Sequence, residues 1–450
     1  MNQWIRWDTA EPSWRWLADA LAMPALLLTP PRAPADITLP ASRLGETSRE
    51  KFLALLGEDG LRQDKEARLA HAARATAADR LRLRAGQAAQ VPDAVLVPRG
   101  KDDVLSILRI CAEDGIAVAA AGDRPHVVLN LARMDRLLSV DFMSGLAEVE
   151  AGISSTELSR QLAARGLWLG PDNFATLGAA QTDAPWLQGM KVATPRGMIE
   201  TEARLPCGVI IAATLRVRAL PTLIEHRHYL FPDFAGGLAA LHEAERQGIA
   251  LTGACLSDAA QTRFNVQMAG ERLNLWQRLE DIYRRARRPD DHAAAALAIT
   301  FCGSDARKRF DALAAKLGAT VRAAPEVSDQ SEALLDRGVT VDSLETFATW
   351  SRLPVLYATA RAALDQAMRQ QSPRAGSHGL VLGRVTCVRA DGANLRLSMI
   401  FPRVLGDGVA QAEMIRDVAE TAMAGPEPSL LATQMQAAIR QVLDPKGIFP

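Results

Sequence analysis

A strand–helix–strand pattern between residues 91 and 122 constrains the fold more than any other segment. The run VPDAVLVPRG predicts a short apolar strand that ends in a turn, and KDDVLSILRICAEDG predicts a helix. The apolar residues of this helix share one face: Val104, Ile107, Leu108 and Cys111. We expect Asp102 or Asp103 to cap its start and Gly115 its end. IAVAAAG then predicts a second buried strand, so the segment is a unit of α/β type.

The rest of the chain divides into two blocks. In the first block, strands are predicted at 127–131, 136–141, 146–150, 190–194, 198–203 and 208–218, with a helix over ISSTELSRQLAARG. From residue 221 on, helices alternate with strands in an α+β pattern that predicts a mostly antiparallel sheet. We therefore expect a helical N-terminal extension over 1–89, one domain over 90–220 and a second over 221–450.

Charge and cysteine usage exclude several classes of function. The 52 basic and 52 acidic side chains give a net charge of zero, whereas nucleic-acid binders need a basic excess. The five cysteines are far apart and none forms a Cys-x-x-Cys pair, which predicts reduced thiols in a cytoplasmic protein. His226 and His228 alternate on an expected strand but lack a third ligand, so we predict no metal site.

The N-terminus is rich in tryptophan, with four of the eight Trp in the first 16 residues. The stretch from Pro12 to Leu28 predicts a short helix with an apolar face, which ends at the prolines of TPPRAP. Such a helix either packs onto its own domain, which we favour, or makes a peripheral contact with a membrane surface or a partner.

Several segments, in order along the chain, resemble one family. They include the stretch from ADRLRLRAGQAAQVPDAVLVPRG to DGIAV, the stretch from VVLNLARMDRLLSVD to LWLGPD, then GVIIAATLRV, GVTVDSLETFATWSRLPVLY and the terminal RQVLDPKGIFP. The chain resembles the FAD-linked oxidases of the vanillyl-alcohol-oxidase (PCMH) type, and within them the alkyldihydroxyacetonephosphate (alkylglycerone-phosphate) synthases. The resemblance implies an α+β fold with a two-lobed FAD-binding domain and an α+β cap domain built on an antiparallel sheet.

The resemblance also implies FAD as the cofactor, although its glycine-rich loops are shortened here. Of the family's pyrophosphate loop, AAAGDRPHVVLNL keeps only Gly122. The second loop, FATLGAAQTDAPW, keeps Thr176, Leu177 and Gly178, and LPCGVII keeps Gly208, Val209 and Ile210 before the closing strand. These seven residues are the predicted cofactor contacts, because glycine lets backbone N–H groups approach a phosphate closely.

The family's catalytic residues are missing from the matching positions. Its Pro-Tyr-Leu-Arg-Asp motif aligns so that Asp329 takes the Tyr position and Ser331 the Arg position. Its His-x-Ser-His strand aligns with Arg384 and Cys387, and its C-terminal His cluster is absent. The resemblance therefore predicts no catalytic residue, and Arg384 is the candidate for binding a substrate phosphate.

Three functional hypotheses follow. We favour a divergent member that has lost the family reaction. Such a member would act as a non-catalytic partner or regulatory subunit of an intact flavoprotein relative, and its expected partner is that relative or a second copy of the chain. The first alternative is an active FAD-dependent oxidoreductase with altered catalytic residues. The second is a protein that binds a smaller ligand where the adenine or the substrate of the family lies.

Overall fold

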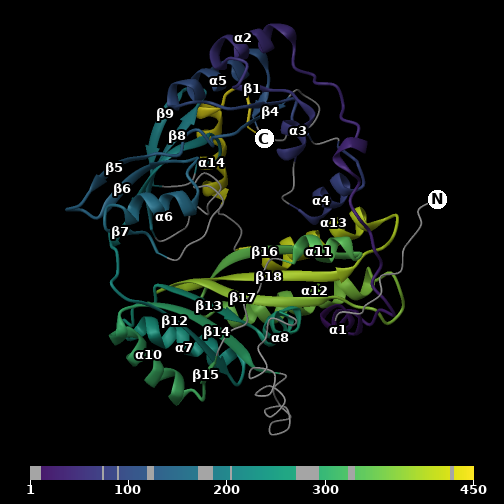
Figure 1. Cartoon of the computed structure of the whole chain (residues 1–450), viewed down its shortest axis with the longest axis vertical. Coiled ribbons are helices and arrows are strands. Elements are labelled where there is room, and N and C mark those ends of the chain that lie inside the picture. The colour runs from purple at the N-terminus through teal and green to yellow at the C-terminus, as the bar shows by residue number, and fades with distance from the viewer. Residues whose placement is uncertain are drawn as a thin grey trace. The chain divides into compact units, whose positions relative to one another are not determined.

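The computed structural model describes residues 12–72, 76–88, 91–118, 126–170, 186–202, 205–269, 293–322, 330–425 and 430–449. The chain forms two compact units (Figure 1). Unit 1 comprises residues 1–31, 75–85 and 221–426, and unit 2 comprises residues 32–74, 86–220 and 427–450. A unit boundary lies at residue 220, but the first 89 residues are divided between the units and the last 24 join unit 2. This differs from three consecutive domains, because cores are assembled by contact and not by chain order.

Unit 2 holds a four-stranded sheet, a five-stranded sheet and a small two-stranded sheet, with several helices. Its elements are η1 (Pro34–Asp36), α2 (Glu46–Leu56), β1 (Leu61–Arg62), α3 (Lys65–Ala70), β2 (Ala94–Leu96), α5 (Lys101–Asp114), β3 (Ala117–Val118), β4 (His126–Leu129), β5 (Leu137–Asp141), β6 (Leu146–Glu150), α6 (Ser155–Ala163), β7 (Leu167–Trp168), β8 (Leu187–Thr194), β9 (Gly197–Thr201), β10 (Val209–Arg216), β11 (Arg218–Ala219) and α14 (Leu430–Leu443).

The first sheet of unit 2 has the order β1-β2-β4-β3, in which β4 pairs in parallel with both β2 and β3. This is the predicted strand–helix–strand unit. The α5 face predicted to be apolar is fully buried, and Gly115 ends the helix with a left-handed φ of 69°. The predicted N-cap was wrong, because Gly100 occupies that position without a side-chain bond and Asp102 and Asp103 lie in the first turn. There their negative charge favours the positive end of the helix dipole.

The second sheet of unit 2 is antiparallel throughout, in the order β5-β6-β10-β8-β9. Its strands lie within a few residues of the predicted ranges, and α6 covers a core that includes Val149, Leu158 and Leu215. The two larger sheets have two hydrophobic clusters, and Ala193 of β8 and Ile211 of β10 pack into the cluster of the first sheet. A two-lobed first domain, as the resemblance implies, matches this arrangement.

Unit 1 is built on one large sheet. Its elements are α1 (Pro12–Ala20), α4 (Ala77–Arg84), β12 (Ile224–Phe231), α7 (Phe234–Arg246), β13 (Gly253–Ser257), α8 (Ala259–Met268), β14 (Ala295–Cys302), α10 (Ser304–Lys316), β15 (Thr320–Arg322), α11 (Ser331–Asp336), β16 (Val339–Thr349), α12 (Leu353–Gln370), β17 (Leu380–Arg389), β18 (Gly392–Pro402) and α13 (Gly408–Met423).

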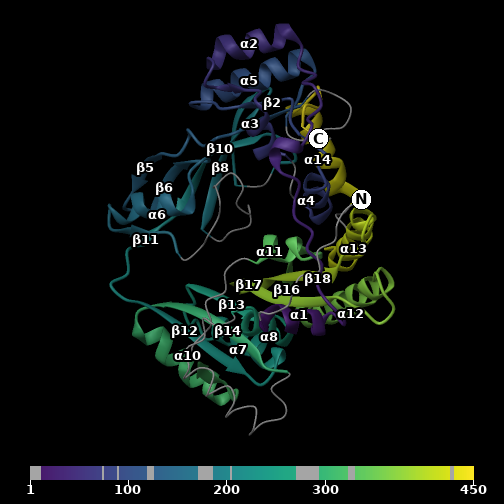
Figure 2. The ribbon, with the colours of Figure 1, turned by 45° about the vertical axis from the view of Figure 1, so that its right-hand side comes forward.

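This sheet has the order β15-β12-β14-β13-β17-β18-β16, and every pair in it is antiparallel, as predicted. Helices cover one face: α7 and α10 contact the strands β12 and β14 (Figure 2), and α12 and α13 contact β16 to β18. The large core of unit 1 lies under these helices. On the opposite face, α1, α8 and α11 cover one end of β16, β17 and β18.

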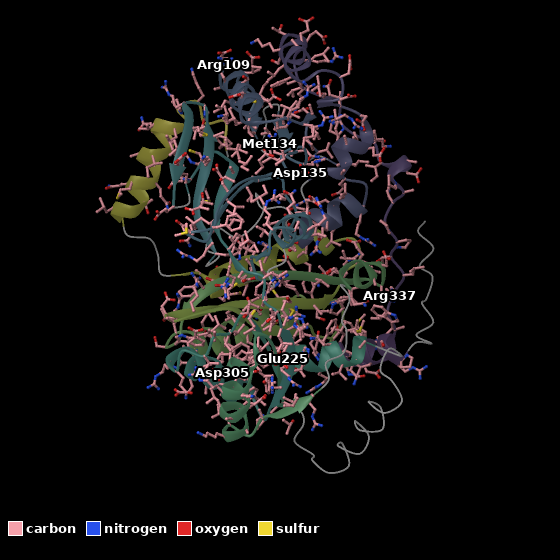
Figure 3. The ribbon with its side chains drawn as sticks, turned by 60° about the vertical axis from the view of Figure 1, so that its left-hand side comes forward. Arg109, Met134, Asp135, Glu225, Asp305 and Arg337 are labelled. Carbon is pink, nitrogen blue, oxygen red and sulfur yellow. The ribbon has the colours of Figure 1, made fainter. Side chains whose placement is uncertain are left out.

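The N-terminal helix packs onto its own unit, which is the interpretation that the sequence favoured. Trp14 is 5% exposed, and the guanidinium of Arg337 (labelled in Figure 3) lies 3.8 Å from the centre of its ring. Trp16 packs edge-on against Phe264 of α8, with 6.3 Å between the ring centres. Among the described residues, no helix combines the length and the apolar character that a membrane span requires.

Candidate functional site

The predicted cofactor contacts divide into two groups. Gly122, Thr176, Leu177 and Gly178 lie outside the described residues, as does Asp329. Gly208, Val209 and Ile210 are described and lie at the beginning of β10 in unit 2.

The backbone at the beginning of β10 suits a planar ligand. Val209 and Ile210 pair with Ala193 and Val192 of β8, but β6 pairs with β10 only from Ala212 onward. Within the described residues, neither has a second strand neighbour, so this edge offers backbone groups that can bond a ligand. Gly208 precedes them with φ +110°, and a Cβ there would be 2.5 Å from Val192 Cγ1. Only glycine allows this turn to lie against β8.

A buried carboxylate holds the start of β4, the strand that follows Gly122 in the sequence. Asp93, at the start of β2, is 2% exposed. Its carboxylate accepts hydrogen bonds from the backbone N–H groups of His126 (2.8 Å) and Arg43 (2.7 Å), and its own N–H donates to the carbonyl of His126 (2.8 Å). Burial lowers the pKa of His126, against the opposing effect of the Asp93 charge. Unit 2 thus fixes the start of β4, directly after the predicted loop, at a defined position.

The sheet of unit 1 carries a row of charged side chains on the face opposite α7, α10, α12 and α13. Arg384 on β17 pairs in register with Arg396 on β18, and Arg396 pairs with Glu345 on β16. Directly opposite residues of an antiparallel pair lie on the same face, with their Cβ atoms about 5 Å apart. Thr386 and Asn394 form the next row. We call the face carrying these five residues the polar face.

Arg384 lacks a partner on the polar face. Its side chain makes no hydrogen bond or ion pair with any residue that the structure describes, and its buried Nε has no acceptor among them. Arg396 donates to Ser343 Oγ at 2.9 Å. Two guanidinium groups directly opposite each other repel, and an anion bound by both would remove that repulsion through charge-assisted hydrogen bonds. The predicted phosphate contact Arg384 therefore lies where an anion is favoured.

Only one oxygen of the Glu345 carboxylate accepts hydrogen bonds from described residues. Its Oε1 accepts from Asn394 Nδ2 at 2.9 Å and from Thr386 Oγ1 at 3.5 Å. No hydrogen bond to Oε2 and no ion pair of this carboxylate occurs within the part of the chain that is described. The polar face thus presents a carboxylate oxygen as well as a free cation.

Cys255 on β13 is close enough to this row to respond to its charges. Burial raises the pKa of the Cys255 thiol, while Arg384 and Arg396 oppose that rise. Burial has the larger effect, so the thiol stays neutral.

Both described tyrosines lie on the helix-covered face of the sheet and not on the polar face. The Tyr357 hydroxyl donates to Asp258 Oδ2 at 2.8 Å, and the Tyr229 hydroxyl donates to Asp311 Oδ1 at 2.8 Å. Burial raises the pKa of both phenols, so each stays protonated. In these positions the hydroxyls stabilise packing and do not reach the polar face.

Cys387, which aligns with a family histidine, lies in an irregular part of β17. The register between β17 and β18 shifts between Thr386 and Arg389, and Cys387 has a φ of +48°. A residue other than glycine with positive φ inside a bulge is strained. His226 and His228 lie on β12, where His226 Nδ1 is 3.0 Å from Thr300 Oγ1.

Comparison with known families assigns both units. Residues 92–183 match the profile of an FAD binding domain, and residues 227–397 match that of the C-terminal domain of FAD linked oxidases. Together the two matches cover more than half of the chain, in the family's order. The chain belongs to the FAD-linked oxidases.

Relatives of this FAD-linked oxidase include an alkyldihydroxyacetonephosphate synthase of Trypanosoma brucei brucei. It is 27% identical over 265 residues, which are 48% of this chain and 43% of the relative. A second synthase of that name, from Dictyostelium discoideum, is 24% identical over 257 residues, or 46% of this chain and 42% of the relative. The aligned regions thus span less than half of either relative.

Solved structures show the same fold. An alkyldihydroxyacetonephosphate synthase matches with a TM-score of 0.78 and 20% identity over 97% of this chain and 91% of that chain. The implied fold, an FAD-binding part followed by a cap with an antiparallel sheet, is therefore confirmed.

FAD is the cofactor of this family, and the described residues fit it. The beginning of β10 offers the backbone edge to which no other described strand pairs, and Gly208 allows close approach beside it. Val209 and Ile210 are the residues that would hold the edge of the flavin ring.

Of the five residues on the polar face of this FAD-linked oxidase, only Arg384 was predicted from the sequence. Arg396 and Glu345 each occupy an alternate position of a strand, in LRLSMIF and DSLETF. That alternation places them opposite the core-facing leucines. It does not reveal which residues lie beside them, because the register between strands distant in sequence depends on tertiary pairing.

Proposed function

We propose that this FAD-linked oxidase binds FAD and a phosphate-bearing ligand but has lost the reaction for which its relatives are named. The observation that carries the proposal is that Arg384 lies directly opposite Arg396 and that its side chain has no partner among the described residues. The relatives are named for alkyldihydroxyacetonephosphate, which has a phosphate group. Paired guanidinium groups suit phosphate oxygens because they donate several hydrogen bonds in fixed directions.

The proposed loss of the family reaction is supported by the side chains of unit 1. Bound FAD supplies an acceptor for two electrons, but the family chemistry also needs an acid–base group beside it. The resemblance places Asp329 and Ser331 at the positions of the family's Tyr and Arg. Tyr229 and Tyr357, the described tyrosines, are bonded to carboxylates on the other face of the sheet.

The purified protein of 450 residues is used to test FAD binding and phosphate binding. We expect a flavin absorption spectrum, directly or after addition of FAD, and binding of inorganic phosphate to the FAD-loaded protein by calorimetry. Arg384→Gln should weaken phosphate binding at least tenfold, the effect of losing a charge-assisted hydrogen bond. Arg369→Gln is the matched control, because Arg369 is an exposed residue of α12 paired with Asp365.

Two results would contradict the proposal. Phosphate affinity that is equal in the wild type and in Arg384→Gln would remove the ligand site. Formation of alkyldihydroxyacetonephosphate by the FAD-loaded protein would show that the family reaction is retained.

A second candidate is an active FAD-dependent oxidoreductase with altered catalytic residues. The observation that favours it is Glu345, whose Oε2 is available to accept a proton on the polar face. Anaerobic bleaching of the flavin absorption by a phosphate ester, abolished in Glu345→Gln, would support this candidate over the first.

A further proposal concerns partners. If the silent member acts through another protein, an intact flavoprotein relative or a second copy of the chain should co-purify with it. Size-exclusion chromatography with light scattering distinguishes the homodimer from the mixed complex and from a monomer, which would contradict both.

A further inference from the structure

Glu345 and Arg384 lie on the two sides of Arg396 in one row of the polar face. Arg384 pairs with Arg396, and Arg396 pairs with Glu345, across three adjacent strands. Adjacent strands are about 4.8 Å apart, so the backbones at Glu345 and Arg384 are about 10 Å apart. The Glu345 carboxylate extends across β18 to Thr386 of β17, so a small ligand over β18 would reach it together with Arg384.

Neither end of this row is neutralised by an ion pair. Arg384 has no partner among the described residues, and the hydrogen bonds of Glu345 come from the neutral groups of Asn394 and Thr386, both to Oε1. Arg396, which lies between them, donates to the neutral hydroxyl of Ser343. Half-buried charges without partners are unfavourable, and a ligand relieves both when it has an anion at one end and a hydrogen-bond donor at the other.

Arg396, in the middle of the row, determines which hydrogen-bond donor of a ligand can approach Glu345. Arg396 pairs in register with Glu345, so an ammonium group on the ligand would lie beside a guanidinium and be repelled. A hydroxyl group donates to Glu345 Oε2 without that repulsion. An apolar group at this point would leave the carboxylate desolvated and unpaired.

We infer that Glu345 is a specificity-determining residue that selects phosphate monoesters with a free hydroxyl group, such as the phosphate ester of a short polyol. The phosphate binds Arg384 and Arg396, and the hydroxyl donates to Glu345. This inference rests on the proposed function, because it assumes the phosphate site on the two arginines.

The test compares two ligands of equal charge on the FAD-loaded protein. Glycerol 3-phosphate has free hydroxyl groups, and methyl phosphate has none. We expect the wild type to prefer glycerol 3-phosphate. In Glu345→Gln its affinity should fall about tenfold, because the hydrogen bond from the hydroxyl to a carboxylate is lost. Methyl phosphate should bind at least as tightly as before, because a negative charge has been removed.

The substitution is chosen to preserve the sheet. Glutamine keeps an oxygen for Asn394 and Thr386 and replaces the free oxygen with a donor. Glu243→Gln is the matched control, because Glu243 lies on α7, on the other side of the sheet, and pairs with Arg246. It should leave both affinities unchanged.

The outcomes separate the two proposals. If phosphate binding depends on Arg384 but Glu345→Gln keeps the wild-type preference, the inference fails and the proposed phosphate site stands. If the wild type binds neither ester, the phosphate site and the inference both fail.

A third ligand identifies the source of the ester. The third ligand is a singly acylated glycerol 3-phosphate, which keeps one free hydroxyl and carries an acyl chain. It is used below the concentration at which it forms micelles. Tighter binding of glycerol 3-phosphate would identify a free phosphate ester as the ligand, and tighter binding of the acylated ester would identify a lipid. In either case, the inference requires that the affinity of the tighter ester fall in Glu345→Gln.

Discussion

At the scale of single residues, Gly383 connects the core of unit 1 to the polar face. A Cβ at this position would be 2.7 Å from Asp258 Oδ2 and 2.8 Å from Tyr357 Cε2. The buried Asp258 carboxylate accepts from the N–H of Gly383 at 2.9 Å and from Arg361 at 2.8 Å. Burial raises the pKa of Asp258 despite these donors. Because Arg384 follows Gly383 directly, this contact also fixes the backbone of the proposed phosphate site.

Gly383→Ala should therefore lower the free energy of unfolding by about 2 kcal/mol or more, since the neighbouring backbone and buried carboxylate must move. It should also weaken phosphate binding, because Arg384 is displaced. Chemical denaturation and calorimetry measure the two effects. Gly425→Ala is the control, because no atom lies within 4 Å of a Cβ built there. Equal stability of the two variants would contradict the close contact.

At the scale of elements, one ion pair joins two helices of unit 2. Asp114 is the last residue of α5, where the helix dipole disfavours a negative charge. It accepts from Lys51 Nζ at 2.7 Å and from Ser48 Oγ at 2.8 Å, both on α2. The bond from Lys51 is the main reason that the pKa of Asp114 lies below its ordinary value of 3.8. The partners outweigh the dipole at this helix end.

Because the folded-state pKa of Asp114 is lowered, its contribution to stability is present above pH 3.8 and is lost as the pH falls through the folded-state value. Asp114→Asn should cost about 1 kcal/mol at neutral pH, since Lys51 is partly exposed and screened. The difference from the wild type should shrink in acid. Urea unfolding at several pH values measures it, with Asp59→Asn as the control. A difference independent of pH would contradict the assignment.

At the scale of the whole molecule, unit 2 is closed by residues from the end of the sequence. Ile448 and Phe449 pack into the same cluster as Phe52, Val104 and Val118. The N–H of Val118 donates to the carbonyl of Ile448 at 2.8 Å. The buried Asp444 carboxylate accepts from the N–H groups of Ile448 and Phe449, both at 2.9 Å. The last residues are thus part of the first sheet's core.

Ile448→Ala should destabilise unit 2 by about 3 kcal/mol, because a fully buried side chain is removed from a packed cluster. Hydrogen exchange followed by mass spectrometry should show lost protection in unit 2 and retained protection in the sheet of unit 1. Leu431→Ala, at a residue that is 66% exposed, should change neither. Equal loss of protection in both units would show that they unfold as one.

The local sequence pattern determined most of the elements. Amphipathic spacing located α5, and the α+β pattern after residue 221 predicted a mostly antiparallel sheet, because helical and strand periodicities depend only on neighbouring residues. The resemblance supplied the family, the fold and the cofactor, and it located Arg384. Boundaries were less exact: the helix predicted from Pro12 to Leu28 ends at Ala20, and the start of α5 is capped by Gly100.

Only the tertiary structure decided what surrounds Arg384. The register of three strands places Arg396 directly opposite it and Glu345 one strand further. These residues come from strands separated in sequence by a turn or by a helix, and no local pattern fixes how far one strand slides past another. The same reason explains why Ile448 closes the core of unit 2. Sequence alone determines which residues prefer burial and in which element they lie, while long-range packing determines which of them meet.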